Sequence, residues 1–256
     1  MKLLTALRAE RLKSKRTASV YLTLIGSAFV PFLFLLNVLT GGSDLKALAK
    51  DPLNSAFELG AERTGVLFFP LFVILVCTLL PQIEYRNNTW KQVFASPQAK
   101  ASVFLAKFLN INRLLLLFLL AHLVFMAVAV LVMHVARPDL HLLEQPFDFG
   151  RVALRTGNMY VTMLAVCALQ FWLGLRFRNF VVPTAVGFVL WVTGMMMALE
   201  FRTALVDYFP YCFHLFPLSP QLQPRLPQVA WTSAGYTFLF LGLGFLDFRR
   251  RRLTSA

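Results

Sequence analysis

The polar residues best suited to do chemistry in this 256-residue sequence lie in one short stretch, residues 84–97, which reads EYRNNTWKQVFASP. Trp90 and Phe94 stand four residues apart, so a helix would place both rings on one face and Lys91 on another. Aromatic rings beside charges are enriched at the centres of protein–protein contacts and also at membrane interfaces. The chemistry indicated is non-covalent: docking to a protein partner or anchoring to lipid headgroups.

Covalent and metal chemistry have no signature in the sequence, which lacks H-E-x-x-H, G-x-S-x-G and G-x-x-x-x-G-K-[ST]. Cys77, Cys167 and Cys212 form no C-x-x-C pair and no metal-ligand spacing, so we expect them to pack as small hydrophobes. The sequence therefore predicts no catalytic residue and no metal or cofactor held by this chain. Any ATP and Mg²⁺ that drive its work must be bound by another polypeptide.

The elements that position this stretch are apolar and long. Hydrophobic residues make up 58% of the chain and charged residues 14%, against about 45–50% and about 25% in soluble domains. Because roughly 20 apolar helical residues cross a ~30 Å hydrocarbon core, the pattern predicts an all-α integral membrane protein. Six spans are expected at residues 19–39, 64–82, 112–134, 156–175, 181–199 and 229–246.

Charge assigns a side to each connection. Of the 25 Lys and Arg residues, 17 fall in the N-terminal arm, the 83–113 loop, the 176–180 turn and the C-terminal tail, with only three of the 12 acidic residues. The positive-inside rule places these segments, and both termini, in the cytoplasm. The net charge of +13 is thereby explained by orientation and anionic lipid, and nucleic acid is not expected as a partner.

The N-terminal arm, residues 1–18, is predicted to form a basic amphipathic helix in the headgroup plane, with Leu3, Leu4 and Leu7 clustered on one face. A disordered basic tail is the alternative. The first span follows without a small-residue cleavage site, so we expect it to be retained. The six-helix domain then covers residues 19–248, and residues 249–256 form a basic tail.

Within the 83–113 loop, Asn87 and Asn88 favour a turn, and Thr89 can begin a short helix that runs from Trp90 to Ala95. Pro97 ends that helix because proline disfavours helical geometry in the residue before it. From Gln98 the chain can again run helically into the third span. We therefore expect a short helix across the membrane face.

The spans contain little that could move an ion. His122 is the one titratable group well inside a span, and a lone histidine there is expected to be hydrogen-bonded packing rather than a proton carrier. No pair of broken short spans indicates the inverted-repeat design of gradient-driven transporters. Coupling to an ion gradient therefore has little machinery in this sequence.

An N-terminal in-plane helix, six spans and the stretch EYRNNTWKQVFASP together resemble the type-2 ABC exporter permeases, in particular the subgroup linked to bacteriocin, lantibiotic and bacitracin self-protection. In that family the loop carries a coupling helix that sits in a cleft of a cytoplasmic ATPase. The resemblance implies that the matching residues are the ATPase-docking set: Glu84, Asn87, Asn88, Thr89, Trp90, Lys91, Phe94 and Pro97, with Lys107 as the basic residue that follows. It names no substrate residues.

The 200–228 connection is apolar but holds five prolines, so it cannot be one straight span. It resembles the re-entrant half-helices that close the outer end of the pathway in this family. An ordinary extracytoplasmic loop with interfacial aromatic residues is the alternative.

The function that follows is a permease subunit in the bacterial cytoplasmic (inner) membrane, which exports an amphiphilic antimicrobial peptide, drug or lipid. The expected partners are two ABC ATPase subunits, a second identical or related permease chain and membrane lipids. Two other classes stay open: a non-transporting scaffold or sensor subunit, and a gradient-driven transporter.

Overall fold

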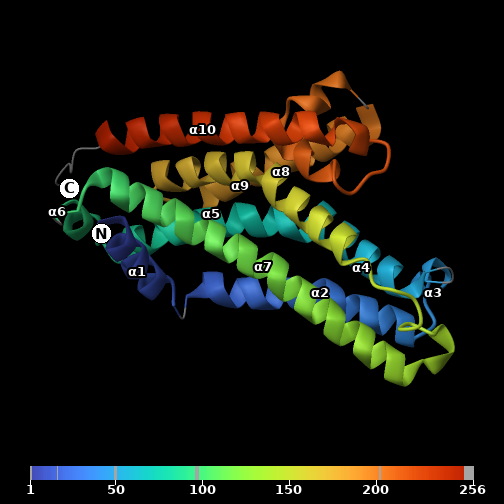
Figure 1. Cartoon of the computed structure of the whole chain (residues 1–256). Coiled ribbons are helices and arrows are strands. Elements are labelled where there is room, and N and C mark those ends of the chain that lie inside the picture. The colour runs from blue at the N-terminus through green and yellow to red at the C-terminus, as the bar shows by residue number, and fades with distance from the viewer. Residues whose placement is uncertain (1, 16, 49–50, 96–97, 202, 251–256) are drawn as a thin grey trace.

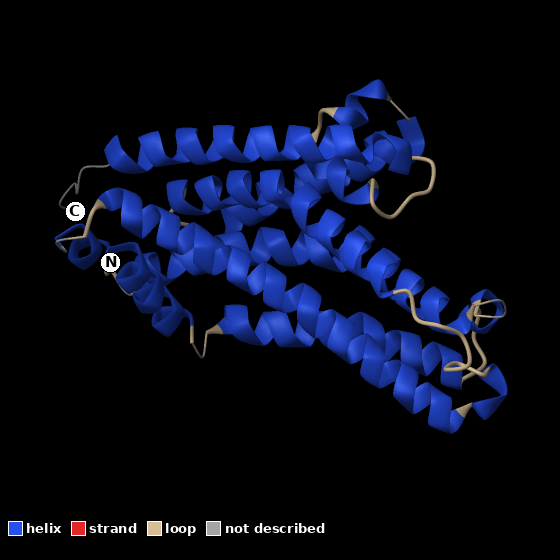
Figure 2. Ribbon diagram, viewed as in Figure 1, coloured by secondary structure: helices blue, strands red, loops and turns tan. Residues whose placement is uncertain are grey.

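The computed structural model describes residues 2–15, 17–48, 51–95, 98–201 and 203–250, and within these ranges it is helical with no strand (Figure 2). The elements are α1 (Lys2–Ser14), α2 (Ala18–Leu39), α3 (Asp44–Ala47), α4 (Pro52–Arg63), η1 (Thr64–Phe68), α5 (Phe69–Arg86), α6 (Trp90–Ala95), α7 (Lys100–Ala136), η2 (Pro138–Leu140), α8 (Phe149–Arg176), α9 (Val181–Met196), η3 (Met197–Phe201), η4 (Ala204–Asp207), η5 (Pro210–Leu215), η6 (Gln223–Arg225) and α10 (Leu226–Arg250).

Among the described residues, six helices are long and apolar enough to cross a membrane, and each contains or overlaps one of the six predicted spans. Several are longer than predicted: the second span is one run of α4, η1 and α5 over 35 residues, and α7 alone has 37 residues. At 1.5 Å per residue α7 is about 55 Å long, well beyond a ~30 Å core. The first turns of α7 can therefore lie outside the membrane. They belong to the 83–113 segment, which the sequence predicts to be a loop.

Both termini lie at the end of the bundle where α6 is found (Figure 1). We call this the α6 end. An even number of spans requires this arrangement, and the sequence predicted it. That the α6 end faces the cytoplasm stays a prediction from the basic residues, as does the basic tail, of which residues 251–256 lie outside the described part of the chain.

The N-terminal helix is present as α1, but its packed face is not made of leucine. The buried positions are Ala6, Glu10 and Ser14, spaced four residues apart along the side that meets α7. Leu4 and Leu12 are exposed instead. This surface suits contact with lipid, while the polar face is held by the protein.

The core is built from close packing, because in lipid the hydrophobic effect does not drive helices together. Phenylalanine rings fill it in pairs, with ring centroids 4.4 Å apart for Phe72 and Phe118 and 5.0 Å apart for Phe104 and Phe171. Cys77, Cys167 and Cys212 are buried free thiols. His122 is buried with its Nδ1 3.3 Å from both the Ser27 carbonyl oxygen and the Thr64 hydroxyl, as expected of a packed histidine.

The proline-rich segment at the opposite end folds back onto the bundle as the short helices η4, η5 and η6. Residues 211–216 are buried where η5 meets α8, α9 and η1. Its prolines interrupt helix geometry every few residues, which explains the short 3₁₀ pieces. The segment therefore covers that end of the bundle instead of extending away from it.

Gly174 allows α5 and α8 to touch through their backbones: a Cβ there would lie 2.6 Å from the Cys77 carbonyl oxygen. Replacing it with alanine should destabilise the protein by about 1–3 kcal/mol, because backbone cannot move aside as a side chain does. The measurement is thermal unfolding of the purified protein in detergent.

Gly157, in the same helix, is the matched control because a Cβ there meets nothing within 4 Å. Gly157→Ala should leave the unfolding temperature unchanged or raise it, since alanine favours helix over glycine. Equal effects of the two substitutions would contradict the α5–α8 contact.

Candidate functional site

The link between α5 and α6 is a tight turn at Asn87, Asn88 and Thr89, which confirms the predicted turn. The Thr89 amide donates to the Glu84 carbonyl (3.0 Å) and the Asn88 amide to the Tyr85 carbonyl (3.3 Å). This is the Schellman pattern, whose central residue must adopt a left-handed conformation. Asn88 does so with φ 51°, which asparagine tolerates better than most residues. The turn fixes the direction in which α6 leaves α5.

α6 runs from Trp90 to Ala95, as the sequence predicts, and Trp90 attaches it to the bundle. The half-buried indole ring lies 5.3 Å from the Tyr85 ring and 5.9 Å from the Phe248 ring of α10, between centroids. The Lys107 Nζ lies 5.4 Å from the indole centroid, within range of a cation–π contact. Trp90 therefore joins α6 to α5, α7 and α10.

The opposite side of the turn and helix is open. Asn87, Asn88 and Lys91 are exposed, and Thr89 is half-buried. The backbone of Phe94 lies in α6, while its side chain and the whole of Pro97 lie outside the described residues. Of the predicted docking set, Asn87, Asn88 and Lys91 form the surface that a partner can reach, and their part in docking stays a prediction.

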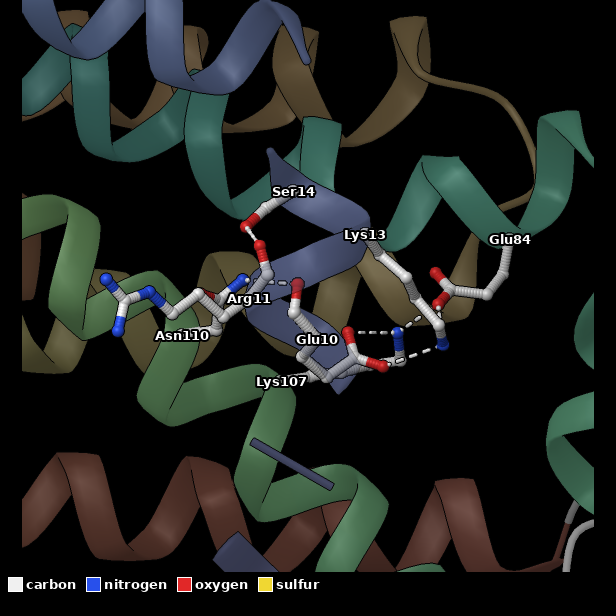
Figure 3. Close-up of polar contacts among 7 residues, drawn as sticks. All are labelled: Glu10, Arg11, Lys13, Ser14, Glu84, Lys107 and Asn110. Carbon is white, nitrogen blue, oxygen red and sulfur yellow. Dashed lines mark hydrogen bonds and ion pairs between the residues drawn. The ribbon is translucent and has the colours of Figure 1, made fainter. Parts of the chain in front are cut away.

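Glu84 is not on this surface, because its side chain is 1% exposed. It lies in an ion cluster with the buried Lys107 and Glu10 and the more exposed Lys13, drawn in Figure 3. The Lys107 Nζ is paired with the Glu84 carboxylate and lies 2.8 Å from Glu10 Oε2. The Lys13 Nζ completes the cluster at 2.9 Å from Glu10 Oε1 and 3.2 Å from Glu84 Oε1.

Two carboxylates and two ammonium groups leave this cluster neutral, which is the condition for charges to be buried at all. Its members come from α1, α5 and α7, so the cluster ties the N-terminal helix to the helix that ends at α6. The backbone carbonyl of Glu10 also accepts a hydrogen bond from the Asn110 amide of α7 (3.4 Å). Glu84 thus positions α6 through the α5 end, rather than presenting a side chain to a partner.

Glu10 and Lys13 owe their protonation states to the cluster. Burial alone would raise the pKa of Glu10, but the charge of Lys107 and the hydrogen bonds from Lys107 and Lys13 outweigh it, so this pKa lies below its ordinary value of 4.5. Burial alone would lower the pKa of Lys13, and the charge of Glu10 outweighs it in turn, so that pKa is raised above 10.5. Both residues are therefore charged near neutral pH.

A second connection at this end involves α10. Asp247 accepts hydrogen bonds from the Trp172 indole nitrogen (3.3 Å) and the Arg176 guanidinium (3.2 Å), both on α8. Asp247 precedes Phe248, which contacts Trp90. These contacts would therefore transmit a displacement of α6 to α10 and α8 as well as to α1, α5 and α7.

Sequence reasoning found Glu84, Trp90 and Lys107 but missed their partners Glu10, Lys13 and Phe248. One signal was present: Glu10 is the sole acidic residue in an arm of six basic ones. Ala6, Glu10 and Ser14 are spaced four residues apart, so they share one face of the helix, which is not the face of the leucines. Phe248 gives no such signal, because phenylalanine is common throughout the last span.

Replacing Lys107 with methionine leaves the two buried carboxylates with Lys13 alone and should destabilise the protein by about 3–5 kcal/mol. Combining it with Glu84→Gln removes the excess negative charge, so the double variant should be more stable than the sum of the single effects predicts. Thermal unfolding of the four proteins in the cycle measures this coupling. Strictly additive effects would mean that Lys107 and Glu84 do not interact.

The lowered pKa of Glu10 predicts a pH dependence. A group whose folded pKa is depressed contributes stability above its unfolded pKa and loses it as pH falls through the folded value. The unfolding temperature should therefore decline below pH 4.5 in the wild type, and Glu10→Gln should flatten this decline. Glu144→Gln, at an exposed carboxyl in the connection between η2 and α8, is the control that should leave the profile unchanged.

Comparison with known proteins agrees with this architecture. Residues 6–194 match the family model described as ABC-2 family transporter protein, which spans the chain from α1 into α9 and includes Glu10, Glu84, α6 and Lys107. No curated protein matches the chain. The matched residues make up most of the sequence. The chain therefore belongs to the ABC-2 transporter family and is a multi-pass membrane permease rather than an enzyme in its own right.

Proposed function

We propose that this permease exports an amphiphilic molecule across the bacterial cytoplasmic membrane with energy from ATP hydrolysed by a separate ATPase. The ATPase docks on α6 and the turn before it, and Mg²⁺ and ATP are bound by that partner. The cargo is an antimicrobial peptide, a drug-like molecule or a lipid. Two permease chains, identical or related, and two ATPase subunits make up the complex.

The observation that carries the proposal is the two-sided placement of α6. Its inner side is fixed by Trp90, while its outer side exposes Lys91 beside Asn87 and Asn88. The family associates with ABC ATPases, and α6 is the short helix that stands at the end of the bundle where the basic residues predict the cytoplasm. A force applied to such a helix would reach five other helices through the contacts described above.

The form of the transport cycle follows from that geometry. Closure of two ATPase subunits on ATP would press α6 against the bundle, and the ion cluster would carry the displacement into α1, α5 and α7 as rigid bodies. Rigid-body tilting is the way packed helices respond, because close-packed interiors do not deform continuously. The apolar core of the spans favours a cargo with a large apolar part.

Charge reversal at Lys91 tests the docking surface. Lys91→Glu should lower the yield of co-purified ATPase in mild detergent by at least about tenfold, because the loss of one important contact at an interface costs about 1.4 kcal/mol or more. The ATPase is identified by mass spectrometry as a protein with the G-x-x-x-x-G-K-[ST] motif. Membrane insertion and thermal stability should not change, since Lys91 is exposed.

Lys15→Glu is the matched control, because Lys15 is also an exposed lysine but directly follows α1, outside the turn and α6. It should leave the yield near the wild-type value. Equal yields from Lys91→Glu and wild type would reject docking at α6. Transport in vesicles that persists without ATP and collapses with a protonophore would reject ATP-driven export altogether.

A further inference from the structure

A cleft opens between α4, α7 and α8, away from the ion cluster. Its upper part, at the start of α8, carries the charged side chains of Glu58, Arg151 and Arg155. Its lower part, further along α8, is narrow, because Leu119, His122 and Met159 line it and are each only 3% exposed, beside the half-buried Leu123. From Arg151 to Met159 the cleft follows α8 for roughly 12 Å at the rise of a helix.

Two arginines and one carboxylate line this cleft, and Asp148 on its rim supplies a second carboxylate. One carboxylate, Glu58, serves two arginines, at 3.5 Å from Arg151 and 3.6 Å from Arg155. These contacts are longer than the 2.7–2.9 Å typical of charge-assisted hydrogen bonds. Arg151 has a second contact, with Asp148 at 3.3 Å on the rim, whereas the contact with Glu58 is the one ion pair of Arg155 among the described residues.

Arg155 is the better placed of the two arginines for binding. Its side chain is 18% exposed, against 55% for Arg151, so it is held inside the cleft with most of its five N–H donors unused by the described residues. A planar guanidinium in this position suits a phosphate or carboxylate group, which can accept two parallel hydrogen bonds. Because the site is partly shielded from water, such a hydrogen bond is stronger there than in open solvent.

The residues around Arg155 indicate what kind of molecule would carry the anionic group. Phe149 and Leu154, in the first turns of α8, are exposed, as are Leu120 and Val124 beside the lower cleft on α7. In a membrane helix these side chains face hydrocarbon or the interface. An anionic group at Arg155 would therefore lie at the start of an apolar track that is open to lipid.

We propose that this cleft binds an amphiphile with one anionic head, a phosphate or carboxylate, and a single apolar chain. The head sits between Arg151 and Arg155, and the chain leaves the cleft past Leu123 and lies along the exposed side chains of Leu120 and Val124. The inference names the cargo class of the permease and so rests on the proposed function. It also predicts that Glu58 competes with the head for the same guanidinium groups.

Binding is measured on the purified permease in a neutral maltoside detergent, by native mass spectrometry over a range of probe concentrations. The probe is dodecyl phosphate, and the comparison arms are dodecanol, which lacks the charge, and inorganic phosphate, which lacks the chain. Dodecyl phosphate should bind at least about tenfold more tightly than either, because both halves of the cleft contribute. Equal binding of inorganic phosphate would reduce the site to a simple anion site and overturn the proposal.

Three variants should change the affinity for dodecyl phosphate in three different ways. Arg151→Gln with Arg155→Gln should weaken dodecyl phosphate binding by about tenfold, because two charge-assisted hydrogen bonds are lost. Glu58→Gln should strengthen binding, because the competing carboxylate is removed. Arg225→Gln is the matched control: Arg225 is paired with Asp207 in a different segment and should leave binding unchanged. Unchanged binding in the double variant, or equal loss in Arg225→Gln, overturns the proposal.

The same preparations distinguish this inference from the proposed function. Co-purification of the ATPase depends on the α6 end and should be equal in wild type and all three variants. A permease that retains its ATPase but does not bind dodecyl phosphate rejects the cleft and leaves ATP-driven export intact. A permease that binds dodecyl phosphate but has no ATPase partner rejects the proposed function instead.

Discussion

A lysine ammonium buried away from water must be surrounded by carboxylates, or the charge is too costly to keep. Lys107 meets this condition only because Glu84 and Glu10 reach it from two other helices, and Lys13 then restores neutrality. Removing any one helix from this arrangement would leave an unpaired charge in the interior. The cluster therefore requires α1, α5 and α7 to be packed together, and the position of α6 follows from theirs.

This requirement gives the N-terminal helix a structural purpose. An amphipathic helix that only floated in the headgroup region could slide relative to the spans. α1 cannot do so, because Glu10 binds Lys107 through its carboxylate and Asn110 through its backbone carbonyl. A rigid base of this kind is consistent with the proposed docking of an ATPase on α6, because a displacement of α6 would then not be lost in the movement of its supports.

The two ends of the molecule are built from different interactions. The α6 end is held by ion pairs and by the tilted and edge-on ring contacts of Trp90 with Tyr85 and Phe248. The opposite end is closed by short proline-broken helices whose rings are buried against the bundle.

The sequence by itself determined the parts of this structure that depend on local patterns. Runs of apolar residues fixed the six spans, and the turn residues Asn87, Asn88 and Thr89 fixed the start of α6. Only the tertiary structure decided which residues of different helices would meet. Glu10 and Lys107 are 97 residues apart, and Trp90 and Phe248 are also distant in the chain. The physical reason is that hydropathy and turn geometry act over a few residues, whereas a buried charge takes its partner from whichever helix packs beside it.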